Sequence, residues 1–159
     1  PATLNGLRPV LSPGPTLTGL TVLLVEDDAS TRDVMERTLA HAGASVLPAG
    51  SSDEALSVLD QLEAEPSERR ALDIMVCDLA LPGMSGHELL ATVVQRYRAR
   101  GNRPPPACAV SAHARDVDRQ RAISAGFDLY LTKPIAPEQL IEAVEDLRDV
   151  AALPRVEEA

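Results

Sequence analysis

The chain has 159 residues, of which 45% are apolar, so a single packed domain is expected rather than disorder. Aromatic residues make up only 2%, so the core must be built from Leu, Val, Ile and Ala. The formal net charge of −9 disfavours direct binding to nucleic acid or to anionic membrane surfaces, whereas divalent cations and basic protein surfaces remain suitable partners.

The two ends of the chain differ in composition from its middle. Residues 1–19 contain four prolines and three glycines, which is typical of a flexible linker, and residues 151–159 are expected to form a loose tail. Residues 20–150 are predicted to form the domain. Because no apolar run is long enough to span a bilayer and no signal pattern opens the chain, a cytoplasmic location is expected. Cys77 and Cys108 lie in apolar runs and are predicted to be buried, reduced thiols.

The first predicted strand, 21–25, is a continuous apolar run. Asp28 or Ser30 can cap the helix that follows, and Gly43 ends it. One face of this helix is expected to hold Val34, Met35, Thr38 and Leu39.

A short second strand is predicted at 44–48. Ser51 and Glu54 form a capping box that opens the second helix. The buried stripe of this helix is expected to contain Ala55, Leu56, Leu59 and Leu62. A charged loop at 63–71 then leads into the third strand, 72–77.

The third predicted helix covers 87–98 and follows a loop rich in glycine. A fourth strand at 107–110 and a fourth helix at 116–125 come next, followed by a fifth strand at 127–131. Pro137 stands at the start of the last helix, where proline is favoured. Apolar residues recur along that helix at helical spacing: Leu140, Ile141, Val144 and Leu147.

Five strands, each followed by a helix, predict an α/β fold with a parallel sheet. Strands that are apolar throughout fit a sheet covered on both faces, and right-handed crossovers make such a sheet doubly wound. Ligands of these folds bind beyond the carboxyl ends of the strands. The residues at those ends therefore indicate the function.

Polar residues lie at four of the five predicted strand ends. Glu26 and Asp27 follow the first strand, and Asp78 follows the third. Ser111 follows the fourth strand, and Lys133 comes soon after the fifth. Converging carboxylates repel one another unless a cation is present, and Mg²⁺, with Mn²⁺ as an alternative, prefers such ligands. A metal, an ammonium and a hydroxyl together suit phosphoryl transfer, for which a carboxylate is a competent nucleophile.

Each of these residues also has an ordinary structural interpretation. The acidic run Glu26-Asp27-Asp28 could simply favour a helix N-terminus, Asp78 could be a turn residue, and Lys133 could be a surface lysine. Their combined occurrence at strand ends favours the site. No glycine-rich phosphate-binding motif follows a strand, so nucleotide binding is disfavoured.

Four segments carry a family resemblance, in order and at predicted strand ends: VLLVEDD at 22–28, CDLALPGMSG at 77–86, VSA at 110–112 and YLTKP at 130–134. Between residues 21 and 150 the chain resembles the receiver domain of the response regulators of two-component signalling. That resemblance implies a flavodoxin-like (βα)5 fold with strand order 2-1-3-4-5. The stretch from Ser111 to Pro134 resembles receivers fused to the carboxyl end of hybrid histidine kinases, and the prolines before Thr21 would suit a linker from such a parent.

The resemblance implies that Asp78 takes a phosphoryl group from the phosphohistidine of a histidine kinase or histidine phosphotransfer protein. Asp27 is then a direct Mg²⁺ ligand, Glu26 more often acts through water, and Ala80 supplies its backbone carbonyl. Lys133 pairs with the phosphoryl oxygens. The chain would catalyse its own phosphorylation and dephosphorylation without being an enzyme in the usual sense.

Three further residues have implied roles. Ser111 matches a switch hydroxyl that moves to contact the phosphoryl group, and Tyr130 matches an aromatic whose ring orientation reports activation. Pro134 matches a proline usually joined to Lys133 by a cis bond. Phosphorylation would then change the surface made by the fourth helix, fifth strand and fifth helix, which a downstream effector protein reads.

Two positions depart from the common pattern of the family. Ala80 stands where a polar side chain is frequent, and His113 lies two residues after Ser111. Both positions tune hydrolysis of the acyl phosphate in the family, so an altered phosphoryl lifetime is predicted. Its direction depends on whether His113 orients the attacking water or blocks it.

Two other functions compete with this interpretation. One is an interaction module that keeps the fold but no longer takes phosphate. The other is an aspartyl phosphatase on a similar sheet, which usually carries a second aspartate where this chain has Ala80.

Overall fold

The computed structural model describes residues 16–64 and 71–151, and these form a five-stranded parallel sheet with five helices. The strands are β1 (Thr21–Val25), β2 (Ser45–Ala49), β3 (Ile74–Asp78), β4 (Ala107–Ser111) and β5 (Leu129–Thr132). The helices are α1 (Ala29–His41), α2 (Ser52–Ala64), α3 (Gly86–Ala99), α4 (Asp116–Ser124) and α5 (Pro137–Ala151). The sheet order β2-β1-β3-β4-β5 confirms the predicted doubly wound α/β fold.

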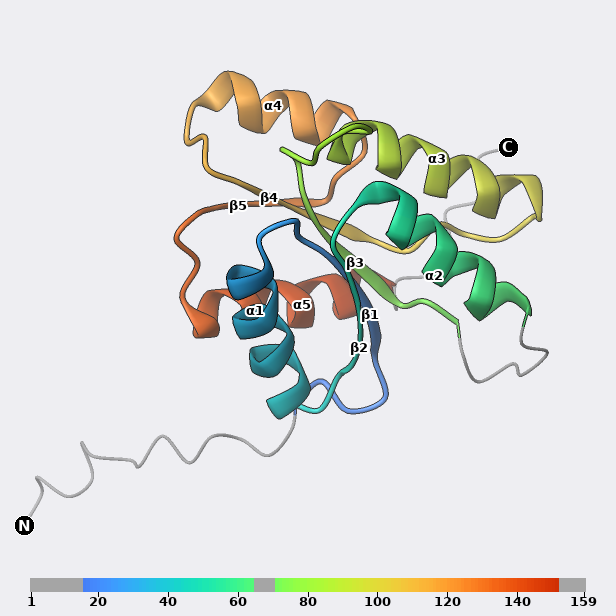
Figure 1. Ribbon diagram of the computed structural model, residues 1–159, viewed down its shortest axis with the longest axis horizontal. Helices are drawn as coiled ribbons and strands as arrows, with labels where there is room; N and C mark the ends of the chain where they lie inside the picture. Colours follow the sequence, from blue (N-terminus) through green and yellow to red (C-terminus); the bar gives the residue numbers. More distant parts are fainter. Residues whose placement is uncertain (1–15, 65–70, 152–159) are drawn as a thin grey trace, which may run out of the picture.

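The helices cover the sheet in two layers, with α1 and α5 on one face and α2, α3 and α4 on the other (Figure 1). Alternate residues of each central strand enter opposite layers of the core, as the two-residue period of a strand requires. Cys77 lies in the layer under α2 and α3, whereas Cys108 lies in the layer under α1 and α5. Both cysteines are buried free thiols, as predicted.

The N-termini of the first three helices lie at the carboxyl edge of the sheet, and side chains cap them. Asp28, not Ser30, caps α1, because its carboxylate accepts the Thr31 N–H at 2.9 Å. The Ser51 hydroxyl accepts the Glu54 N–H at 3.1 Å, as a capping box requires. The Glu54 carboxylate, however, accepts the N–H of Gly50 instead of that of Ser51, so the predicted capping box is only half formed. None of the described helices is long and apolar enough to cross a membrane.

Several predicted details were wrong. Val34 was expected on the apolar face of α1 but is 60% exposed, because Met35 and Leu39, four residues apart, define the buried side of that helix. Strand β3 begins at Ile74 instead of 72, and β5 begins at Leu129 instead of 127. Leu72 and Phe127, each two residues before one of these strands, are buried in the core without belonging to the strand.

The folded part of the chain begins before residue 20. Leu17 is fully buried, and its N–H donates to the carbonyl of Ala42 at 2.9 Å. The Thr16 hydroxyl donates to the Glu145 carboxylate at 2.9 Å, and Arg148 donates to the Thr16 carbonyl. Thr16 and Leu17 therefore pack against the domain. Residues 1–15 and the tail from 152 to 159 lie outside the described residues.

Candidate functional site

Acidic residues from two neighbouring strands converge at the carboxyl edge of the sheet. Glu26 directly follows β1 and Asp78 ends β3, the strand paired beside it. Both side chains are almost completely buried, with 1% and 4% exposure, whereas Asp27 is exposed. Burial of two carboxylates is costly unless they are paired, so the surrounding groups decide what this site can do.

Lys133 supplies the compensating charge. Its Nζ atom donates to both oxygens of the Glu26 carboxylate, at 2.8 and 3.0 Å, and to Oδ2 of Asp78 at 2.9 Å. The lysine follows β5, the edge strand, and only the crossover topology brings it to the acidic pair. One ammonium therefore bridges the two buried carboxylates.

The second oxygen of Asp78 is also held. The backbone N–H of Ala80 donates to Asp78 Oδ1 at 2.9 Å. Close packing fixes the turn behind it, because a Cβ atom on Gly86 would lie 2.4 Å from the Asp78 carbonyl oxygen and 2.8 Å from the Leu79 Cα. Only glycine fits at that position, which explains the glycine that opens α3.

The two carboxylates have opposite pKa shifts. Burial, reinforced by the neighbouring Asp78 carboxylate, raises the pKa of Glu26 to about 7, although Lys133 acts in the other direction. Burial also acts to raise the pKa of Asp78, but hydrogen bonds from the Glu26 carboxyl group in its protonated form, from Lys133 and from the Ala80 amide outweigh burial and leave that pKa below its usual value. For Lys133, burial acts to lower the pKa, and the bonds to both carboxylates outweigh burial and raise it.

The cluster fits a hard divalent cation. Carboxylate oxygens of Glu26, Asp27 and Asp78 all lie within 4.8 Å of one another. The raised pKa of Glu26 reflects burial and repulsion that a cation would relieve. Oxygen ligands in this number suit Mg²⁺ or Mn²⁺. The backbone carbonyl of Ala80 as a further ligand stays a prediction.

The remaining predicted residues gather around the end of β4. The Ser111 hydroxyl accepts the His113 N–H at 3.1 Å, and the Ser111 carbonyl accepts the Lys133 N–H at 2.8 Å. The Tyr130 hydroxyl donates to the His113 carbonyl. The peptide bond between Lys133 and Pro134 is cis. Ser111 and Tyr130 are therefore both tied to the segment that joins β4 to α4.

Sequence reasoning missed two residues that hold the loops of this site. Arg32 in α1 donates to the Glu26 carbonyl at 2.9 Å, and Ser52 in α2, which is buried, donates to the Met84 carbonyl at 2.8 Å. Both bonds go to backbone carbonyl oxygens of loops, so no side-chain motif signals them. The His87 ring packs edge-on against Phe127 with centroids 6.1 Å apart.

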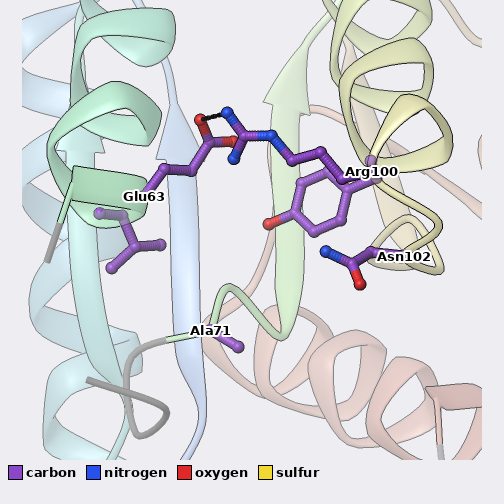
Figure 2. Close-up of a pocket in the computed structure, with 6 residues that line it drawn as sticks. Glu63, Ala71, Arg100 and Asn102 are labelled. Atoms are coloured by element: carbon purple, nitrogen blue, oxygen red, sulfur yellow. Dashed lines mark ion pairs between the residues drawn. The ribbon is translucent and has the colours of Figure 1, made fainter. Parts of the chain in front are cut away.

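A separate pocket of about 150 Å³ lies near the C-terminal ends of α2 and α3 (Figure 2). Figure 2 shows the ion pair between Glu63 and Arg100 above it, with a distance of 2.8 Å. The lining residues are Leu62, Glu63, Ala71, Tyr97, Arg100 and Asn102. Because both helices begin at the carboxyl edge of the sheet and run back from it, this pocket lies at the edge opposite to Asp78.

Comparison with known proteins identifies a family for this chain. Residues 22–145 match the response regulator receiver domain family. An uncharacterized 14.6 kDa protein from Leptolyngbya boryana is 41% identical over 130 residues, covering 82% of this chain and 91% of that protein. The sensor histidine kinase GacS of Pseudomonas protegens is 31% identical over 123 residues, covering 77% of this chain but only 12% of the kinase.

A solved structure has the same arrangement of elements. The CheY-like response regulator receiver domain protein from Methanospirillum hungatei is 25% identical, with a TM-score of 0.68 over 83% of this chain and 95% of that one. The family match covers most of the chain, and its limits enclose every acidic residue of the cluster. The chain belongs to the response regulator receiver domain family of two-component signalling.

Proposed function

We propose that Asp78 accepts a phosphoryl group from the phosphohistidine of a histidine kinase or histidine phosphotransfer protein. The observation that carries this proposal is the hydrogen bonding of its carboxylate, with Lys133 at 2.9 Å on one oxygen and the Ala80 amide at 2.9 Å on the other. Its lowered pKa keeps the carboxylate ionised and therefore nucleophilic.

The transfer exchanges one bond to phosphorus for another. An oxygen of the Asp78 carboxylate forms the new P–O bond while the P–N bond to the imidazole of the donor breaks. The imidazole nitrogen keeps the electron pair of that bond and takes up a proton from water. A bound Mg²⁺ would neutralise charge on the phosphoryl oxygens. Glu26, Asp27, Asp78 and the Ala80 carbonyl are the groups that would hold it.

Lys133 and Ser111 would bind the phosphoryl group once it is attached. The Lys133 ammonium, now shared between two carboxylates, can turn to a phosphoryl oxygen without leaving the site. The Ser111 hydroxyl can donate to another oxygen because its present bond, from the His113 amide, uses only its acceptor capacity.

The signal would leave the site through the segment after β4. Ser111 and Tyr130 both bond to His113, so a movement of the Ser111 hydroxyl toward Asp78 disturbs the anchor of the Tyr130 ring. The surface formed by α4, β5 and α5 is then the one that a downstream effector protein would recognise. The similarity to GacS, of which this chain spans 12%, supports the receiver of a hybrid histidine kinase as one origin.

A single experiment separates this function from an interaction module that takes no phosphate. The protein is incubated with acetyl phosphate and Mg²⁺, and its intact mass is measured beside that of Asp78→Asn. We expect wild type, but not the variant, to gain the mass of one phosphoryl group. An unchanged wild-type mass, together with no spectral response to beryllofluoride, would favour the phosphate-independent module.

A further inference from the structure

Arg32 makes a contact that no motif in the sequence predicts. Its guanidinium Nη1 donates to the backbone carbonyl of Glu26 at 2.9 Å. That carbonyl belongs to the peptide group that joins Glu26 to Asp27. The contact reaches from the first turns of α1 back to the loop that carries both acidic residues. Arg32 therefore fixes the orientation of a peptide group inside the acidic site.

The two acidic residues depend on this peptide group to different degrees. The Glu26 side chain is held by two bonds to Lys133, and its N–H donates to the Ala49 carbonyl at 3.0 Å. The Asp27 side chain is exposed, and among the described residues its carboxylate has no hydrogen-bond partner. The backbone alone sets the position of Asp27, and Arg32 holds that backbone.

The guanidinium is itself confined. It packs over Gly50 at the end of β2, where an added Cβ atom would lie 3.1 Å from its Nη1 and 3.6 Å from its Cζ. The Glu54 carboxylate accepts the Gly50 N–H at 2.8 Å and lies against the same point. Gly50 does not have a positive φ, so the backbone conformation does not require glycine there, but a larger residue would have to displace the Arg32 guanidinium.

We propose that Arg32 is a positioning residue for the divalent cation: it orients the peptide between Glu26 and Asp27 so that the Asp27 carboxylate is presented to the metal. This inference rests on the proposed Mg²⁺ site. Groups behind metal ligands commonly act in this way, because they fix a ligand that would otherwise sample many orientations.

If Arg32 acted only through its charge, its removal would change the Mg²⁺ affinity in the direction opposite to that expected for a positioning residue. The guanidinium is a positive charge bonded to the loop that carries Glu26 and Asp27, so deleting it should make the site more attractive to a cation. Loss of positioning should make binding weaker. The sign of the change in Mg²⁺ affinity therefore distinguishes the two roles.

The test compares Arg32→Ala with Arg37→Ala. Arg37 lies on the same helix, is exposed and pairs with Asp33 at 3.2 Å, so its removal deletes the same charge from α1 without touching the Glu26 carbonyl. Mg²⁺ affinity is measured by calorimetry, and amide hydrogen exchange of Asp27 is measured in EDTA. We expect Mg²⁺ to bind Arg32→Ala roughly tenfold more weakly, and the Asp27 amide to exchange faster, with Arg37→Ala close to wild type.

A second variant, Gly50→Val, retains the Arg32 charge but is designed to displace the guanidinium. Gly50→Val crowds the guanidinium while retaining Arg32, and we expect it to weaken Mg²⁺ binding as well. This variant also decides the matter if Arg32→Ala does not fold. If Arg32→Ala and Gly50→Val melt in EDTA at temperatures close to that of Arg37→Ala, their weaker Mg²⁺ binding reflects a change at the metal site and not a loss of the fold.

Two results would overturn the inference, and they differ in what else they affect. If wild type binds Mg²⁺ and Arg32→Ala binds it equally or more tightly, Arg32 does not position Asp27, while the proposed function stands. If wild type binds no Mg²⁺ and gives no beryllofluoride response, both the proposed function and this inference fail.

Discussion

The ammonium of Lys133 lies 2.9 Å from the carboxylate of Asp78, although 55 residues separate them in the chain. The same ammonium lies 2.8 Å from the Glu26 carboxylate. In the absence of metal, Lys133 is thus the cation of the site. Any change that removes it leaves two buried carboxylates facing each other.

Replacing Lys133 by Met should therefore lower the stability of the metal-free protein. The lost bonds to two carboxylates lead us to expect a decrease of about 2 kcal/mol in the free energy of unfolding, measured by urea denaturation in EDTA. Arg100→Met, which removes only the surface pair with Glu63, is the control and should cost less than about 1 kcal/mol. Equal losses in the two variants would contradict the bridging role of Lys133.

Mg²⁺ should stabilise the protein through the acidic cluster. A ligand that binds only the folded state at a hundredfold excess over its Kd adds about 2.7 kcal/mol. We expect Mg²⁺ to raise the melting temperature of wild type and to have a much smaller effect on Asp27→Asn. Asp53→Asn, which removes one exposed carboxylate from the first turn of α2, is the matched control and should respond as wild type does.

Gly86→Ala should be strongly destabilising because the new Cβ atom would meet backbone, which cannot move aside cheaply. Its distance of 2.4 Å to the Asp78 carbonyl oxygen predicts a loss of about 3 kcal/mol. Gly101→Ala serves as control: that glycine has a φ of 72° but open space around it, so only about 1 kcal/mol of backbone strain is expected. Thermal or urea unfolding of both variants measures the difference.

Leu17→Ala tests whether the segment before β1 belongs to the domain. Removing a fully buried leucine typically costs about 3 kcal/mol. Val34→Ala, at a residue 60% exposed on α1, should change stability by less than about 0.5 kcal/mol. If Leu17→Ala were as mild as Val34→Ala, residues 16–19 would contribute little to the fold.

The lifetime of the aspartyl phosphate provides a kinetic prediction. Ala80→Asn adds a polar group two residues after Asp78, and His113→Ala removes the side chain of the residue whose backbone joins Ser111 and Tyr130. We expect at least one variant to change the decay rate of radiolabelled phosphoprotein severalfold relative to wild type. Unaltered decay in both would rule out a tuning role for these side chains.

The order of the elements, the parallel sheet and the polar residues at its carboxyl edge could all be predicted from the sequence. Hydrophobic periodicity is a local property of the sequence, and right-handed crossovers are nearly universal, so both can be used for prediction without knowledge of tertiary contacts. Glu26, Asp78 and Lys133 could be expected to converge because every strand of a parallel sheet ends at the same edge.

Which side chains contact one another could not be predicted in this way, because it depends on how the elements pack. Val34 was predicted on the buried face of its helix, but the orientation of α1 about its axis leaves it exposed. Leu17 was predicted in the linker, but it is buried in the core layer that contains α5. The bond from Arg32 to the Glu26 carbonyl has no sequence signature, because its acceptor is a backbone atom common to all residues. Such contacts depend on the register and rotation of whole elements, which are set by packing over the entire core rather than by any local pattern.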